Sequence, residues 1–208
     1  MMRMMKLGGV LFLLCISLEV CAKSAAVKVL VLGDSLSAGF GIRSEYGWVR
    51  LMQQDLQTRH GVQLLNASVS GETSSGGLTR LPALLRDYQP GIVVLELGGN
   101  DGLRGQPLTL LESNLQAMID AALGSGARVL LVGMQIPGSY GARYSKQFKE
   151  IFPKIAAKNK LSLVPFLLEA VAVHPEWMQT DGIHPKEEGQ ARMKENVLPF
   201  LLPMLKLK

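Results

Sequence analysis

The chain has 208 residues, of which 48% are hydrophobic and 19% are charged. A chain of this length and composition can bury one substantial hydrophobic core, so we expect a single domain, and a disordered or collagen-like protein is excluded. The formal net charge is +5. The basic residues are dispersed among acidic and apolar ones, which indicates a solvated surface and no nucleic-acid partner.

The first residues of the chain predict a signal peptide. Arg3 and Lys6 precede an apolar run, residues 7–18, that is too short to cross a bilayer as a helix. Small residues follow this run and fit the pattern for cleavage after Ala22. We therefore expect residues 1–22 to be a signal peptide that is removed on export to the periplasm or the medium.

Residues 23–208 would then form the mature domain, with no stable membrane span. Both cysteines of the chain, Cys15 and Cys21, precede the cleavage point, so no disulfide and no cysteine-based metal site is expected in the mature protein. Lipidation of Cys21 is the alternative to simple cleavage, but Glu19 and Val20 are poor neighbours for a lipoprotein signal.

Apolar runs of strand length alternate along the chain with segments of helical periodicity. The runs lack polar alternation, which is typical of strands buried on both faces of a parallel sheet. The expected strands are residues 27–32, 62–67, 92–97, 128–133 and 161–166. The expected helices are residues 47–60, 77–88, 108–123, 145–160 and 185–204, with Pro199 and Pro203 limiting the end of the last one. This order predicts an α/β fold, a single three-layer α/β/α domain around a doubly wound, five-stranded parallel sheet of the flavodoxin-like type.

In such a sheet, ligands bind beyond the carboxyl ends of the strands, near the point where the strand order reverses. Functional residues are therefore expected directly after the strands. The turns at these positions are rich in glycine and polar residues and comprise residues 33–35, 68–71, 98–101 and 134–137.

Ser35 follows the first expected strand, where its hydroxyl would be exposed at the edge of the sheet. The simplest interpretation is a serine that caps a helix, because a hydroxyl acts as a nucleophile only when a base accepts its proton. Of the three histidines, His60 suits a helix C-terminus and His174 lies in a loop. His184 is the candidate base, because Asp181 precedes it closely enough to orient the ring.

Pro185 keeps His184 out of the helical conformation and can itself start the last helix. The alternative interpretation of this segment is a capped helix start with an unrelated aspartate nearby. For the oxyanion of an acyl-transfer reaction, the candidate donors are the N–H groups of Ser35 and Gly71 and the side-chain amide of Asn100. Taken alone, a glycine and an asparagine in turns need no function.

Four segments together resemble a known family. GDSLSAGFG, SVSGETSSGGLTRLPALL, LELGGNDGLRG and WMQTDGIHP are similar to the conserved blocks of the SGNH (GDSL) hydrolases, and the similarity covers about residues 27–203. Within this family the chain most resembles the bacterial group of multifunctional thioesterase I, protease I and lysophospholipase enzymes, together with the related arylesterases. The resemblance implies that Ser35, Asp181 and His184 form a catalytic triad. It also implies that Ser35, Gly71 and Asn100 form the oxyanion hole.

The expected activity is hydrolysis of carboxylic esters and acyl thioesters, including lysophospholipids, through an acyl-enzyme intermediate. The loops expected to line the cleft are mostly apolar, which favours medium to long acyl chains. The candidate substrate-binding residues are Gly76, Leu78, Leu103, Ile136 and Pro137. No metal or organic cofactor is required, and we expect a monomer. The alternatives are a carbohydrate O-deacetylase of the same superfamily and a lipid-binding protein without catalytic activity.

Overall fold

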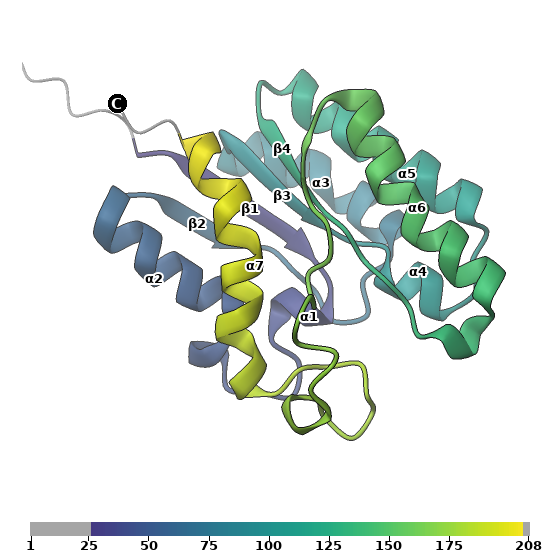
Figure 1. Cartoon of the computed structure of the whole chain (residues 1–208). Coiled ribbons are helices and arrows are strands. Elements are labelled where there is room, and N and C mark those ends of the chain that lie inside the picture. The colour runs from purple at the N-terminus through teal and green to yellow at the C-terminus, as the bar shows by residue number, and fades with distance from the viewer. Residues whose placement is uncertain (1–25, 206–208) are drawn as a thin grey trace, which may run out of the picture.

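The computed structural model describes residues 26–205, which form a five-stranded parallel sheet with helices on both faces (Figure 1). The strands are β1 (Lys28–Gly33), β2 (Gln63–Asn66), β3 (Ile92–Glu96), β4 (Arg128–Val132) and β5 (Ser162–Val164). Their order is β2-β1-β3-β4-β5. The predicted fold class is therefore confirmed. The signal peptide predicted at residues 1–22 lies outside the described residues.

The central strands consist of aliphatic residues because both of their faces are covered. In β1, residues 29–32 are completely buried, and β3 and β4 carry similar runs of buried valine, leucine and isoleucine. The edge strands β2 and β5 are shorter and begin with an exposed polar residue. Burial on both faces is what removes polar alternation from the central strands.

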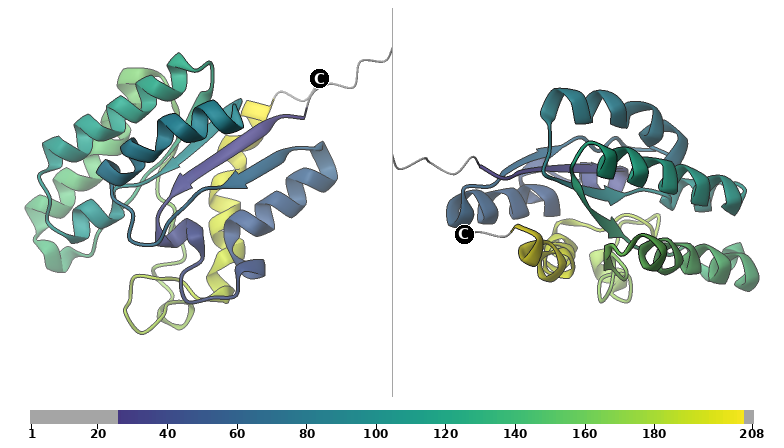
Figure 2. Two further views of the ribbon diagram at one scale, coloured as in Figure 1. Left: turned by 180° about the vertical axis from the view of Figure 1, so that it is seen from behind. Right: turned by 90° about the horizontal axis from the view of Figure 1, so that it is seen from above.

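Within residues 26–205, five long helices pack on the sheet, and two short ones follow strands. The long helices are α2 (Trp48–His60), α3 (Ser74–Tyr88), α5 (Leu108–Gly124), α6 (Ala142–Asn159) and α7 (Glu187–Leu205). The short helices are α1 (Ser35–Ala38) and α4 (Gly99–Leu103), and single 3₁₀ turns occur at η1 (Ser44–Tyr46), η2 (Gly138–Tyr140) and η3 (Pro175–Trp177). Figure 2 shows α3 and α5 on one face of the sheet and α2, α6 and α7 on the other.

The last helix begins later than predicted, whereas its end agrees with the predicted end at about residue 204. It begins at Glu187, because Pro185 instead forms an antiparallel bridge with Met178. It then continues through Pro199 and Pro203 to Leu205. Proline removes a backbone hydrogen bond from a helix. Here the buried apolar face of α7 packs on the sheet and keeps the segment helical despite that loss.

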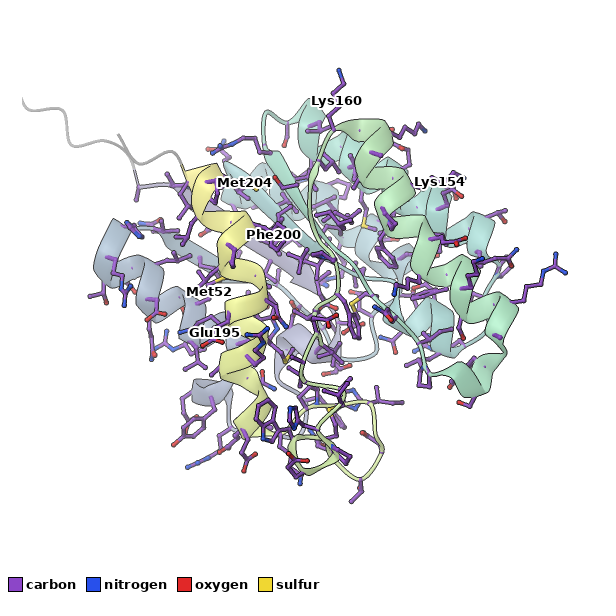
Figure 3. All side chains as sticks on the ribbon, in the orientation of Figure 1. Met52, Lys154, Lys160, Glu195, Phe200 and Met204 are labelled. Carbon is purple, nitrogen blue, oxygen red and sulfur yellow. The ribbon has the colours of Figure 1, made fainter. Side chains whose placement is uncertain are left out.

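The basic residues of α6, and Lys160 directly after it, lie on the outside of the molecule. Figure 3 shows the side chains of Lys154 and Lys160 pointing away from the sheet. Lys154 forms an ion pair with Glu112 of α5, with 2.7 Å between Nζ and Oε1. Over residues 26–205, no helix combines the length and the apolar character that crossing a membrane would need.

The sheet order determines where a ligand can bind. From β1 the chain crosses to β2 on one side, whereas β3, β4 and β5 follow on the other. The order therefore reverses between β1 and β3, and a crevice opens at the carboxyl ends of these two strands. The turn containing Ser35 leaves β1 at this point, and the turn containing Asn100 leaves β3 beside it.

The long segment between β5 and α7 is anchored to the end of β4 and reaches α1 (Figure 1). Gly133 donates its N–H to the Val164 carbonyl (2.8 Å) and accepts from the N–H of Leu167 (3.1 Å). A Cβ atom on Gly133 would lie 2.9 Å from the Val164 oxygen and closer still to that of Pro165. Only glycine lets the backbone of this segment approach β4 so closely.

Gly133→Ala should therefore lower the free energy of unfolding by about 1–3 kcal/mol, because the backbone of residues 164–165 has to move. Urea unfolding monitored by circular dichroism measures the change. Gly124→Ala is the matched control, since a Cβ on Gly124, at the end of α5, meets nothing within 4 Å and its backbone is compatible with alanine. Equal stability of the two variants would contradict the close approach at Gly133.

Candidate active site

The turn after β1 presents Ser35 at the carboxyl edge of the sheet. β1 ends at Gly33, and Asp34 caps α1 by accepting the N–H of Leu36 (3.0 Å). Ser35 is the first residue of α1, so its N–H has no acceptor within the helix. The helix ends after one turn at Gly39, which adopts a left-handed conformation with φ 76°. Ser35 thus offers both a hydroxyl and an unused N–H group to the crevice.

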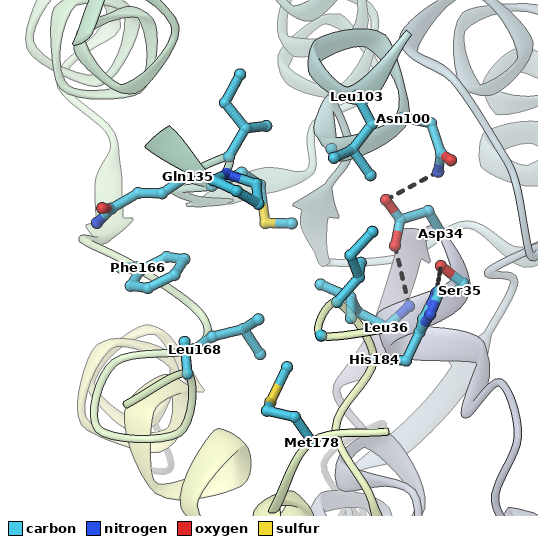
Figure 4. Close-up of a pocket in the computed structure, with 17 residues that line it drawn as sticks. Asp34, Ser35, Leu36, Asn100, Leu103, Gln135, Phe166, Leu168, Met178 and His184 are labelled. Atoms are coloured by element: carbon cyan, nitrogen blue, oxygen red, sulfur yellow. Dashed lines mark hydrogen bonds between the residues drawn. The ribbon is translucent and has the colours of Figure 1, made fainter. Parts of the chain in front are cut away.

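The structure brings Ser35, His184 and Asp181 together, as the sequence predicted, and Figure 4 shows the contact between Ser35 and His184. Nε2 of His184 lies 2.8 Å from Oγ of Ser35, although the two residues are 149 positions apart. Nδ1 of His184 lies 2.7 Å from Oδ2 of Asp181. In a neutral imidazole one nitrogen donates and the other accepts, so Nδ1–H donates to the carboxylate and Nε2 accepts from the serine hydroxyl.

Asp181 is held in its ionised form by the backbone around it. Partial burial favours the neutral acid, but this is outweighed by hydrogen bonds from the His184 N–H, the His184 ring and the Ile183 N–H, which together lower the pKa of Asp181 to about 2. The two backbone bonds, of 3.0 and 2.9 Å, both end on Oδ1. Gly182, with φ 67°, allows the turn that brings these amides to the carboxylate.

A short hairpin-like segment holds Asp181 and His184 in place. The N–H of Gln179 donates to the His184 carbonyl (2.7 Å), and Met178 pairs with Pro185 in an antiparallel bridge. The Gln179 side chain donates to the carbonyl of Phe40 (2.8 Å), just beyond α1. This contact connects the histidine segment to the serine segment.

The ring of Phe40 packs against the ring of His184, with the centroids 4.7 Å apart. Sequence reasoning missed this residue. The phenylalanine follows α1 in an irregular segment, where no periodicity indicates which way a side chain points.

The residues expected to stabilise an oxyanion occupy neighbouring turns. Asn100 lies in α4 and donates from Nδ2 to Oδ2 of Asp34 (3.2 Å) and to the Glu72 carbonyl (2.9 Å). Gly71, next to Glu72, has φ 80° in a turn closed by the bond from the Glu72 N–H to the Val69 carbonyl (3.1 Å). Both amide hydrogens of Asn100 are thus engaged with protein acceptors, and an oxyanion would have to displace one of them.

A cavity of about 390 Å³ opens beside Ser35 and His184. Three of the predicted substrate-binding residues, Leu103, Ile136 and Pro137, line it. The other two, Gly76 and Leu78, are not among the residues that line it. They belong to α3, where Gly76 packs against the Glu72 side chain and Leu78 packs on the core.

The remaining apolar lining comes mainly from the segment after β5, which sequence reasoning missed. Figure 4 shows Phe166 and Leu168 on the side of the cavity away from Ser35, with Met178 nearer to His184. Ala172 completes this group. These residues have no regular spacing in the sequence, so no pattern predicts that they share a surface. Within residues 26–205, no group of three or more His, Cys, Asp or Glu side chains is placed to hold a metal ion.

A serine hydroxyl that faces the accepting nitrogen of an oriented imidazole can attack a carbonyl carbon without a metal ion. The apolar cavity beside it can take the acyl part of a substrate. The class of protein that combines these features is the serine hydrolases.

Comparison with known proteins narrows this class. The sequence model of the GDSL-like Lipase/Acylhydrolase family matches residues 31–192. Esterase TesA of Pseudomonas aeruginosa is 46% identical over 206 residues, which is 98% of this chain and 100% of the relative. Thioesterase 1/protease 1/lysophospholipase L1 of Escherichia coli K12 is 41% identical over 88% of this chain and 86% of the relative. The chain therefore belongs to the GDSL-like lipase/acylhydrolase family.

A solved structure agrees with this assignment. The psychrotrophic esterase EstA from Pseudoalteromonas, inhibited by monoethylphosphonate, has 38% sequence identity and superimposes with a TM-score of 0.81. The alignment covers 86% of this chain and 98% of that one.

The carboxyl group of Asp34 is buried directly behind Ser35. Burial raises its pKa to about 6, even though the Leu36 N–H, His184 and the Asn100 amide favour the ionised form. Between its ordinary pKa of 3.8 and this value, the folded protein binds more protons than the unfolded chain does. The stability that Asp34 contributes is therefore present at acidic pH and is lost as the pH rises through about 6.

Asp34→Asn should remove this pH dependence. Relative to the variant, the natural protein should lose on the order of 3 kcal/mol of stability between pH 4 and pH 7, as expected from a shift from 3.8 to about 6. Urea unfolding of both proteins across this range measures the difference. Any constant cost of the substitution cancels, because only the change with pH matters. A difference that stays the same at every pH would contradict the shift.

Proposed function

We propose that this protein is a serine esterase and thioesterase that hydrolyses medium- and long-chain acyl esters, acyl thioesters and lysophospholipids. The single observation that carries the proposal is the 2.8 Å contact between Ser35 Oγ and His184 Nε2, beside an apolar cavity. The names of the esterase and thioesterase relatives support the same activity.

In the first half of the reaction, His184 Nε2 takes the hydroxyl proton of Ser35 while Oγ attacks the carbonyl carbon of the substrate. The oxyanion that forms is stabilised by the N–H groups of Ser35 and Gly71 and by the Asn100 amide. Asn100 exchanges one of its present acceptors, Asp34 or the Glu72 carbonyl, for the oxyanion.

In the second half, the protonated His184 donates its proton to the leaving alcohol or thiol, and the acyl group stays on Ser35. Water then attacks the acyl-enzyme with His184 again as the base, which releases the carboxylic acid and restores the serine. Asp181 stabilises the imidazolium in both halves, and with a pKa of about 2 it stays ionised across the working pH range.

The cavity favours lipid-like acyl chains over sugars. Each buried CH₂ group contributes about 0.8 kcal/mol to binding in apolar surroundings. A carbohydrate deacetylase would need aromatic platforms, but Trp48 is completely buried and Trp177 stacks on His174 at 4.4 Å. The carbohydrate O-deacetylase is therefore the weaker candidate.

We also propose that the protein acts outside the cytoplasm, because its first residues fit a signal peptide. Expression of the full chain in a Gram-negative host, followed by fractionation and N-terminal sequencing, tests this. The expected product is periplasmic or secreted and starts at Lys23. An uncleaved chain in the cytoplasmic fraction would contradict the proposal.

Ser35→Ala should lower kcat for p-nitrophenyl esters by on the order of 10⁴-fold or more while the protein stays folded, because no other group replaces the attacking oxygen. Covalent labelling by a fluorophosphonate should also disappear. Ser44→Ala is the control, since Ser44 is exposed in η1, outside the cavity lining. Retained turnover in the Ser35 variant would reject the assignment of the nucleophile.

Leu168→Trp should shorten the cavity and change the chain-length preference. If the larger ring displaces about four methylene groups, kcat/KM for a decanoyl ester should fall on the order of 10²-fold, with little change for an acetyl ester. Leu123→Trp, at an exposed position of α5, is the matched control. A parallel loss for both esters would mean that the acyl chain binds elsewhere.

A further inference from the structure

Glu96 is a carboxyl group that the mechanism above does not use, although it lies directly under the catalytic turn. It is the last residue of β3, and the sheet register places it opposite Gly33 of β1. The side chain has no exposed surface. Gly33 has no side chain, and a Cβ at that position would collide with Oε2 of Glu96. The carboxyl group therefore packs against the backbone from which the Ser35 turn departs.

Among the described residues, only one oxygen of Glu96 has hydrogen-bond partners. Oε2 lies 2.5 Å from Oγ of Ser37 and 3.2 Å from the backbone N of Asp34. These two contacts lie on either side of Ser35 in the chain. Oε1 is buried and has no hydrogen-bond partner among the described residues.

The charges around Glu96 disfavour a negative charge on it. The ionisable group that acts on it is the Asp34 carboxyl, which is itself buried and in turn faces His184 and Asp101. No Lys or Arg of the described residues forms an ion pair or hydrogen bond with Glu96. Burial and the neighbouring Asp34 both raise the pKa of Glu96 well above its ordinary value. A carboxylate here would be a buried charge with one oxygen unsatisfied, which is among the most costly arrangements in a protein interior.

We propose that Glu96 is protonated at neutral pH and acts as a positioning residue, which fixes the Asp34 amide and the Ser37 side chain and thereby sets the direction of Ser35. The inference rests on the proposed function only for its effect on turnover.

The absence of a charge on Glu96 matters for the reaction as well. A second negative charge beside Asp34, behind the oxyanion hole, would oppose the charge that develops on the substrate oxygen.

Three variants test this role. Glu96→Gln is the neutral isostere, which keeps an oxygen able to accept from Asp34 N–H and Ser37. Glu96→Ala removes both contacts, and Ser37→Ala removes one of them without changing the buried acid. Glu72→Gln is the matched control, because Glu72 is a largely buried carboxylate near the site that pairs with Arg80 at 2.6 Å and needs its charge.

The measurements are kcat, KM, the rate of fluorophosphonate labelling of Ser35 over a range of pH, and the infrared spectrum. Glu96→Gln should label and turn over within about threefold of the natural protein, with an unshifted pH profile. Glu96→Ala should lower kcat by on the order of tenfold to 10²-fold with a smaller change in KM, as for a misplaced nucleophile. If that variant does not fold, Ser37→Ala supplies the same comparison, with a smaller loss in kcat.

The infrared spectrum gives a result that does not depend on activity. At about pH 8, where Asp34 is ionised, the natural protein should show the C=O band of one protonated carboxyl group, and Glu96→Gln should lack it. Absence of that band, or a Glu96→Gln variant as inactive as Glu96→Ala, would overturn the proposal. Failure of the proposed function would appear separately, as full turnover by Ser35→Ala.

Discussion

The hydrogen bond between Ser35 Oγ and His184 Nε2 is the contact on which the site depends. Its two partners come from opposite ends of the domain, and no local structure brings them together. β1 carries the serine to the carboxyl edge of the sheet, and the segment between β5 and α7 returns the histidine to the same edge. The contact thus requires the complete parallel sheet and the close packing of that segment on the end of β4. A substitution that loosens the sheet or the packing of that segment is therefore expected to lower the rate of catalysis even when it changes no reacting group.

Three carboxyl groups around this contact differ because their surroundings differ. Asp181 is near the surface and accepts three hydrogen bonds, so it stays ionised and supports an imidazolium. Asp34 is buried but keeps donors on both oxygens, and Glu96 is fully buried with donors on one. From Asp181 through Asp34 to Glu96, solvent exposure decreases, and on Glu96 one oxygen also lacks a hydrogen-bond donor. The pKa values of the three carboxyl groups therefore differ. A negative charge is therefore favoured on Asp181, beside the histidine, and disfavoured on Glu96, under the turn that carries Ser35.

The same architecture explains the shape of the substrate cavity. Regular elements supply Ser35 and Asn100, whereas an irregular segment after β5 supplies Phe166, Leu168 and Met178. The amino-acid sequences of loops vary more among related proteins than those of the strands that support them. Acyl-chain preference can therefore change within this fold while the reacting groups stay in place. The Asn100 amide adds a second feature, because both of its hydrogens are bonded to protein acceptors in this structure.

The sequence by itself determined the fold class, because short aliphatic runs such as residues 29–32, alternating with segments of helical periodicity, indicate strands covered on both faces. It also determined the candidate residues Ser35, Asp181 and His184, since a nucleophile, a base and an orienting carboxylate are chemically recognisable types. Tertiary structure alone decided that α7 begins only at Glu187, that Gly76 and Leu78 lie outside the cavity, and that Phe40 packs on His184. It also decided that Glu96 lies under the catalytic turn. Local periodicity reports which face of an element is buried, but what that face meets depends on residues distant in the chain.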